Sequence, residues 1–180
     1  QMTFYVSTEC EPVFMFEEEF MSPNLVIGNN QLTLKNTVNK KWSTSRVNAK
    51  MTSGLHRWEV HIDRCISKNI FIGVCTAEAK FDNYCGCDKF GWAFLANKAI
   101  WHNKSKSKAY GELFRSGDSV IVTLDLDNGT LSFALNGLSL GSAVTGLEGP
   151  LYPAFSLYNE DDQISISMPK LCPSSLSWRT

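Results

Sequence analysis

The stretch 124–137 reads as a β-hairpin that ends in a second turn. Apolar side chains alternate with polar ones on both sides of Asn128-Gly129, and a period of two places one set on one face of a sheet. Asn-Gly favours the positive φ angles that a two-residue hairpin turn requires. The alternating apolar positions are Val120, Val122, Leu124, Leu126, Leu131, Phe133 and Leu135. A chain containing this unit is expected to form antiparallel sheets.

Further segments with a period of two occur along the rest of the chain, separated by Gly and Asn. They are 31–34, 57–62, 91–95, 99–102, 151–157 and 164–168. The segment 70–76 is a continuous apolar strand. No segment carries a long 3.6-residue apolar stripe, and only 17–21 is a candidate for one turn of helix. Gly73, inside a strand, indicates either close approach of a neighbouring backbone or a bulge. We therefore predict an all-β fold, a sandwich of two antiparallel sheets.

The length of 180 residues suits one domain. We assign 25–168 to the sandwich, 1–24 to an N-terminal extension that packs on it, and 169–180 to a C-terminal tail.

Charge and cysteine content narrow the class of protein. The 17 Lys and Arg nearly balance the 18 Asp and Glu, so we expect neither nucleic acid nor a membrane as partner. The six cysteines are scattered, and a chain of this length does not need disulfides to fold. No signal peptide opens the chain, and no apolar stretch is long enough to cross a bilayer. We expect an intracellular, cytoplasmic protein with free thiols.

Three patterns suggest chemistry, and each has a simpler structural explanation. Gly137-Leu-Ser-Leu-Gly141 matches the hydrolase nucleophile elbow but lacks its strand–helix context, so we expect Ser139 on a strand. Cys85-Gly-Cys87 with His102 lacks the second Cys pair of a zinc site. The acidic cluster 160–162 lacks the spaced ligands of a calcium loop. We expect no catalytic residue, no metal and no cofactor.

Five motifs, in order along the chain, resemble the SPRY domain family. They are Ser53-Gly-Leu-His-Arg-Trp-Glu-Val60, Phe71-Ile-Gly-Val74, Gly91-Trp92, the hairpin 124–137 and Tyr152-Pro-Ala-Phe155. The resemblance covers about 25–168 and implies a bent sandwich of the jelly-roll or concanavalin type. It also implies protein recognition rather than catalysis. Domains of this family are commonly modules of larger proteins, many of them ubiquitin ligases or substrate adaptors.

The resemblance also implies where a partner binds, because ligands of the family sit on one surface formed by several loops. Tyr84 matches the family's loop tyrosine, whereas Asn36 stands where peptide-binding members carry arginine, so their acidic-peptide specificity does not carry over. Tyr and Trp are enriched at protein interfaces, and Tyr110 also lies beside an expected loop. The predicted partner-binding residues are Asn36, Thr37, Trp42, Tyr84, Trp101, Tyr158, Asn159 and Glu160.

The preferred hypothesis is a monomeric module that recruits a protein or peptide, within a larger protein such as a ubiquitin ligase. One alternative is a lectin, in which Trp42 or Trp101 would stack on a sugar ring. Another is an intramolecular scaffold that packs on a second domain of its parent.

Overall fold

The computed structural model describes residues 14–168; the segment 1–13 and the predicted tail 169–180 lie outside the described residues. One short 3₁₀ helix precedes a series of strands. The elements are η1 (Glu18–Phe20), β1 (Leu25–Gly28), β2 (Thr33–Asn36), β3 (Ser43–Arg46), β4 (Leu55–Arg64), β5 (Phe71–Cys75), β6 (Gly91–Leu95), β7 (Ala99–His102), β8 (Ser105–Ala109), β9 (Ser119–Asp125), β10 (Thr130–Leu135), β11 (Leu138–Val144), β12 (Tyr152–Leu157) and β13 (Gln163–Ser167).

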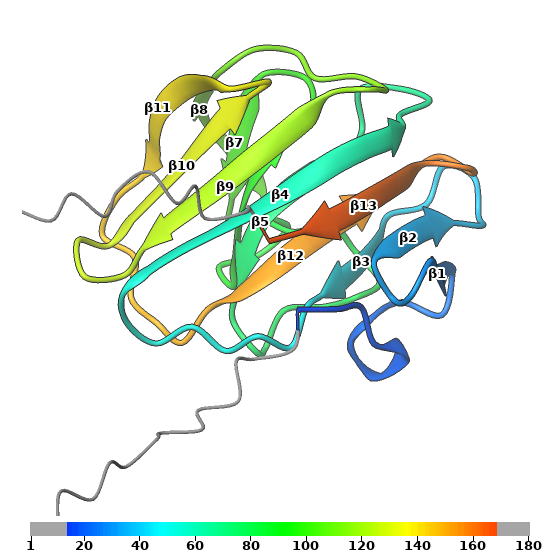
Figure 1. Cartoon of the computed structure of the whole chain (residues 1–180), viewed down its shortest axis with the longest axis horizontal. Helices are drawn as coiled ribbons and strands as arrows, with labels where there is room; N and C mark the ends of the chain where they lie inside the picture. Colours follow the sequence, from blue (N-terminus) through cyan, green and yellow to red (C-terminus); the bar gives the residue numbers. More distant parts are fainter. Residues whose placement is uncertain (1–13, 169–180) are drawn as a thin grey trace, which may run out of the picture.

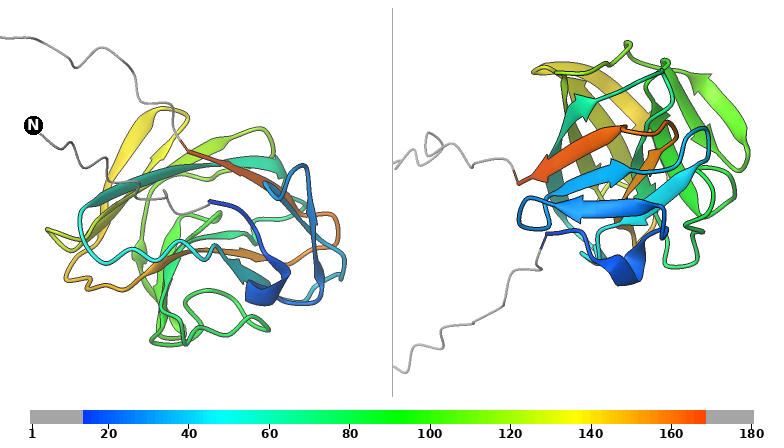
Figure 2. Two further views of the ribbon diagram at one scale, coloured as in Figure 1. Left: turned by 60° about the horizontal axis from the view of Figure 1, so that its bottom comes forward. Right: turned by 90° about the vertical axis from the view of Figure 1, so that its right-hand side faces the viewer.

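The strands form two antiparallel sheets that face each other (Figures 1 and 2). The seven-stranded sheet has the order β1-β2-β13-β4-β9-β10-β11, and the six-stranded sheet has the order β3-β12-β5-β6-β7-β8. The right-hand view of Figure 2 shows β13 beside β2, so the last strand completes a sheet begun by the first. The predicted fold class, an antiparallel sandwich, is confirmed.

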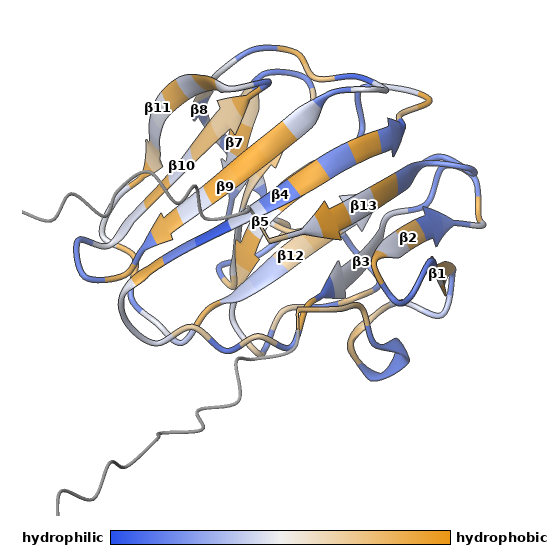
Figure 3. Ribbon diagram, viewed as in Figure 1, coloured by the Kyte–Doolittle hydropathy of each residue, from blue (hydrophilic) through white to orange (hydrophobic). Residues whose placement is uncertain are grey.

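The core lies between the sheets because the strands alternate in hydropathy. Strand β4 shows this banding in Figure 3, with Trp58, Val60 and Ile62 buried and the residues between them more exposed. Other fully buried side chains come from both sheets and from the connections between strands. The largest of them include Phe16, Phe94, Phe114, Phe133, Phe155 and Leu34.

The hairpin that predicts the fold class has a different turn from the one expected. Asp125 pairs with Thr130, so β9 and β10 are joined by four residues, 126–129, and not by a two-residue Asn-Gly turn. The Asp125 carboxylate accepts hydrogen bonds from the backbone N–H and the side-chain amide of Asn128, at 3.1 and 2.7 Å. In this loop only Gly129 has a positive φ, of 69°. The carboxylate therefore selects a longer loop than the dipeptide alone would favour.

The two-residue turn occurs at the next position. Asn136 and Gly137, with φ of 49° and 84°, connect β10 to β11, and Leu135 pairs with Leu138 across them. The Asn136 side chain accepts a hydrogen bond from the backbone N–H of Ser119 at 2.9 Å. The second turn predicted from the sequence is thus the tight one.

A Gly137→Ala substitution is expected to lower the free energy of unfolding by about 1–2 kcal/mol, because an L residue is strained at positive φ. Urea denaturation followed by tryptophan fluorescence would measure the loss. The neighbouring Leu138→Ala is the control, because its side chain is 74% exposed. An equal loss in both variants would show that the turn conformation is not responsible.

The described part of the N-terminal extension, 14–24, contributes to the core. Phe16 is completely buried, and its ring lies 5.5 Å from that of Phe155. Its backbone N–H donates to the carbonyl of Gln31 at 2.8 Å. A bridge between Met21 and Ser45 holds the segment that follows η1 against β3. The division of the chain at residue 24 stays a prediction.

Within residues 14–168, no helix combines the length and the apolar character that a bilayer span requires.

Candidate functional site

Five aromatic side chains from separate parts of the chain meet on the outer face of the six-stranded sheet. They are Trp42 before β3, Phe71 on β5, Tyr84 in the loop between β5 and β6, Trp101 on β7 and Tyr158 after β12. The four predicted members are partly exposed, and Phe71 is buried beneath them. We call this group the aromatic platform.

The rings of the platform are in direct contact with one another. Trp42 lies 4.8 Å from Tyr158, 5.1 Å from Phe71 and 5.5 Å from Tyr84, measured between ring centroids. Tyr84 stacks on Phe71 at 5.0 Å and meets Trp101 edge-on at 5.8 Å. Such contacts stabilise each ring in one position. The structure therefore brings together all four aromatic residues that the sequence predicted as partner-binding.

Phe71 was missed by reasoning from the sequence, which treated 70–76 as one continuous apolar strand. In the structure, Ile72 and Val74 point into the core, while Phe71 and Cys75 belong to the apolar cluster on the outer face. The period of two within β5 could have revealed this, because it places Phe71 on the same face as Gly73 and Cys75 and on the opposite face from Ile72 and Val74.

Asn36 and Asn159 hold two of the binding loops together from inside the protein. The Asn36 side chain is completely buried and donates to the carbonyls of Val38 and Asn159, at 2.9 and 3.0 Å. Asn159 is also buried, and its side-chain oxygen accepts from the Ser67 hydroxyl. Direct contact of either side chain with a partner, as the sequence predicted, does not fit this burial. Their hydrogen bonds make them positioning residues.

Asp162 anchors the same region. Its carboxylate accepts hydrogen bonds from the backbone N–H groups of Ile66, Tyr158 and Asn159, at 2.9, 3.2 and 2.8 Å. Burial raises the pKa of this carboxyl, and the three N–H donors offset part of that rise. The anchor fixes the loop that begins with Tyr158.

The remaining predicted residues lie at the edge of this region. Thr37 is exposed and donates its hydroxyl to the carbonyl of Asn24 at 2.7 Å. Glu160 is exposed, and its backbone N–H donates to the side chain of Asn39 at 3.2 Å. Partner binding by these two side chains stays a prediction.

Tyr110 does not belong with the loop aromatics. It is buried in the main core, where its hydroxyl donates to the carbonyl of Gly141 at 2.6 Å. Its ring packs edge-on against Phe94. A position next to an expected loop was therefore a poor indicator of exposure for this residue.

The cysteines of residues 14–168 are free thiols. Burial raises the pKa of Cys75 to about 12 and that of Cys87 to about 11, so both are protonated at neutral pH. His102 hydrogen-bonds the carbonyl of Gly91 through its Nδ1 and stacks on Trp92. No group of three potential metal ligands gathers in the described residues.

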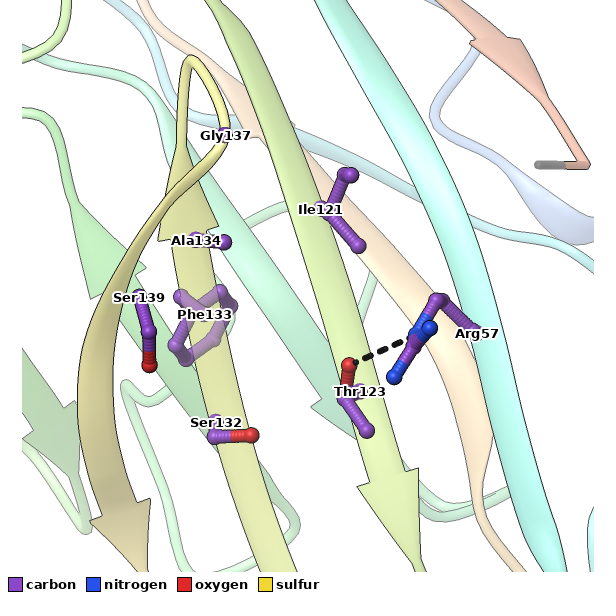
Figure 4. A pocket seen from close by; sticks show the side chains of 8 residues that line it. All are labelled: Arg57, Ile121, Thr123, Ser132, Phe133, Ala134, Gly137 and Ser139. Carbon is purple, nitrogen blue, oxygen red and sulfur yellow. Dashed lines mark hydrogen bonds between the residues drawn. The ribbon is translucent and has the colours of Figure 1, made fainter. Parts of the chain in front are cut away.

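Ser139, the serine of the elbow-like motif, lines a groove of about 320 Å³ on the seven-stranded sheet (Figure 4). At one side of this groove, the Nε of Arg57 on β4 donates to the hydroxyl of Thr123 on the neighbouring strand β9 at 3.2 Å. The other lining residues are Ile121, Ser132, Phe133, Ala134 and Gly137. None of these is a histidine or a carboxylate, so the groove brings no general base to Ser139.

Comparison with known proteins agrees with the family resemblance seen in the sequence. A family model described as the SPRY domain matches residues 55–170. Protein gustavus of Drosophila melanogaster is 32% identical over 122 residues, which are 59% of this chain and 44% of that protein. SPRY domain-containing SOCS box protein 1 of Homo sapiens is 33% identical over 135 residues, which are 63% of this chain and 48% of that protein. The chain spans about half the length of these relatives.

Solved structures share the fold at lower sequence identity. The SPRY domain of human HERC1 superimposes with a TM-score of 0.75 at 20% identity, covering 87% of this chain and 99% of that one. The TRIM65 PSpry domain superimposes with a TM-score of 0.70 at 15% identity, covering 87% and 92%.

Proposed function

The chain belongs to the SPRY domain family of protein-interaction modules, and we propose that it recruits a protein or peptide partner through the aromatic platform. The observation that carries this proposal is the convergence of Trp42, Tyr84, Trp101 and Tyr158 on one face. Catalysis plays no part in the proposed role.

The physical properties of the platform suit protein binding. Tyr and Trp offer large, rigid apolar area together with a polar group, and such residues dominate the binding free energy at interfaces. Burial raises the pKa of Tyr84, so its phenol is neutral and can donate a hydrogen bond. Because the rings already contact one another, little conformational entropy remains to be lost on binding.

A protein ligand is favoured over a carbohydrate. Stacking on a sugar needs an open ring face, and Trp42 is packed against three other rings of the platform. A glycan array that gives no signal for the wild-type protein is the expected result.

We further propose that the chain acts within a larger intracellular protein, such as a ubiquitin ligase or its substrate adaptor, and is monomeric as an isolated module. The relatives support this proposal, because the chain spans about half of their length and one relative is named for its SOCS box.

The decisive experiment starts from peptides selected on the wild-type protein with a random phage-displayed library. Isothermal titration calorimetry should show that a Tyr84→Ala, Tyr158→Ala double variant binds them about 30-fold more weakly, equivalent to about 2 kcal/mol.

The matched control is a Leu55→Ala, Leu138→Ala double variant, which removes two exposed apolar side chains from the seven-stranded sheet. Its affinity should equal that of the wild type. Peptides that bind the platform variant normally and lose affinity for the control would place the binding site on the other sheet.

A further inference from the structure

The first half of β4 has a neighbouring strand on only one side. Strand β9 pairs with residues 55–61 of β4, whereas β13 pairs on the other side with residues 59–64 and ends beside Glu59 (Figure 1). Within residues 14–168, no strand lies beside 55–58 on the side of β13. An unpaired edge of this kind readily accepts a further strand.

The backbone of Arg57 points toward this open edge. Successive residues of a strand direct their N–H and C=O groups to opposite sides. At one end of β4, the carbonyl of Gly54 accepts from the N–H of Leu126 at 2.9 Å. At the other end, the N–H of Ile62 donates to the carbonyl of Asp118 at 2.8 Å, so the even-numbered residues of β4 face β9. Arg57 therefore presents its N–H and C=O groups to the side on which β13 has ended.

A pocket of about 60 Å³ adjoins the open edge, because His56, Arg57 and Trp58 of β4 are among its lining residues. The other side chains that line it are Phe14, Ala49, Lys50, Met51 and Met168. Arg57 and Lys50 are exposed, and neither forms an ion pair within residues 14–168. The pocket therefore offers an apolar interior beside two cations that have no acidic partner in this part of the chain.

Both segments outside the described residues are attached at this pocket. Phe14 directly follows 1–13, and Met168 directly precedes 169–180, so either segment reaches the open edge within a few residues. The segment 169–180 contains two basic residues and no acid, so its charge repels the rim of the pocket. It also begins with Pro169, which has no N–H to donate to a β ladder.

The segment 1–13 has the charge and the β propensity that suit this edge. It contains Glu9 and Glu11 and neither Lys nor Arg, so its charge complements that of Arg57 and Lys50. Its stretch 3–8 reads Thr-Phe-Tyr-Val-Ser-Thr, and β-branched and aromatic residues favour strands. Charge and pairing thus both select this segment as the occupant.

We propose that the segment 3–11 adds a strand to the open edge of β4, with Glu9 and Glu11 beside Arg57. Residues two apart share one face of a strand, so both carboxylates reach the outer face of the sheet, where Arg57 is exposed. Cys10 between them faces the pocket, where a thiol packs as a small apolar group. The added strand also pairs with the backbone N–H and C=O groups of Arg57.

NMR spectroscopy of the full ¹⁵N-labelled chain of 180 residues tests this proposal. Cross-strand NOEs should connect the amide proton of Arg57 with protons of residues 8–11. NOEs from Arg57 to residues 170–173 would overturn the proposal in favour of the other segment. The proposal would equally be wrong if the Arg57 amide showed no NOE to any residue outside 14–168.

Amide hydrogen exchange measures the pairing itself. A Glu9→Pro, Glu11→Pro double variant removes two N–H donors from the added strand, so the Arg57 amide should exchange at least ten-fold faster than in the wild type. The amide of Trp58, which faces β9, should keep its rate, and this distinguishes loss of the added strand from loss of the fold. The matched control, Lys170→Pro with Cys172→Pro, should leave Arg57 unchanged. Acceleration in the control alone would overturn the assignment.

A second pair of variants tests the role of charge. Glu9→Gln with Glu11→Gln keeps the backbone donors and removes the carboxylates, so exchange at Arg57 should accelerate by about three-fold. Glu18→Gln with Glu19→Gln is the control, because it removes two exposed acids from η1. Equal rates in the two variants would show that the carboxylates do not pair with Arg57. The aromatic platform lies on the other sheet, so its variants should leave these rates unchanged.

Discussion

A Gly73→Ala substitution is expected to lower the free energy of unfolding by about 4 kcal/mol or more, which approaches the whole stability of many domains. Gly73 lies on β5 with β6 on one side and β12 on the other. An added Cβ would stand 2.0 Å from the carbonyl oxygen of Trp92 and 2.6 Å from the Cα of Ala93. These are backbone atoms of a paired strand, so no side-chain rotation relieves the clash. Guanidinium denaturation would show the loss, or an unfolded spectrum would replace the native one.

Gly28→Ala is the matched control, because it adds the same methyl group to another strand. No atom lies within 4 Å of the Cβ that would be added at Gly28. That variant should be as stable as the wild type or slightly more stable, since alanine restricts the unfolded chain. If Gly73→Ala unfolded at the same denaturant concentration as Gly28→Ala, the close approach of β6 would be wrong.

Asp162→Asn should lower the free energy of unfolding by about 2–3 kcal/mol. Oδ1 accepts from Ile66, and Oδ2 accepts from Tyr158 and Asn159. Whichever oxygen becomes an NH₂ group will then face a backbone donor, and that N–H loses its acceptor. Hydrogen exchange should accelerate at the amides of Ile66 and Asn159, where the loop is anchored.

Asp161→Asn is the control for this change, because it removes the same charge from the adjacent residue. Asp161 is 45% exposed and pairs with Lys35 at 3.2 Å, so its loss should cost less than about 1 kcal/mol. Equal losses in the two variants would mean that net charge, and not the buried hydrogen bonds, determines the effect.

The pH dependence of the Asp162→Asn variant follows from the direction of the pKa shift. Burial raises the pKa of Asp162 above its ordinary value of 3.8, so the folded protein binds this proton more tightly than the unfolded chain. The wild type therefore gains stability from this group as pH falls through the folded pKa and loses it as pH rises. The variant has no carboxyl that can bind this proton. The difference in free energy of unfolding between the wild type and the variant should therefore be larger at about pH 4 than at about pH 7. If this difference in free energy of unfolding became smaller at low pH, the raised pKa of Asp162 would be contradicted.

The strands were predictable because their signal is local. A period of two sets the faces of a strand, and it predicts both β9 and β10. Gly73 indicated either close approach of a backbone or a bulge, and the structure shows the close approach. The prediction of a two-residue turn at Asn128-Gly129 was wrong. The carboxylate of Asp125, three residues before Asn128, accepts a hydrogen bond from the backbone N–H of Asn128 and favours a longer loop. Dipeptide preferences do not include such a competing side chain.

The site was predictable only in part. Aromatic residues near loops suggested a binding surface, and Trp42, Tyr84, Trp101 and Tyr158 do meet there. The same rule failed for Tyr110, which is buried. Exposure depends on what packs over a residue, and that neighbour often lies far away in the sequence.

The sequence by itself determined the all-β class and the positions of the principal strands along the chain, because alternation and turn chemistry act over a few residues. Its five ordered motifs indicated the SPRY family by resemblance. Only the tertiary structure decided which side chains a partner can reach. Asn36 is sealed by Asn159, which is 123 residues away, and Tyr152 covers Arg46 from the neighbouring strand. Burial and unpaired charge arise from contacts between distant segments, and no short stretch of the chain encodes them.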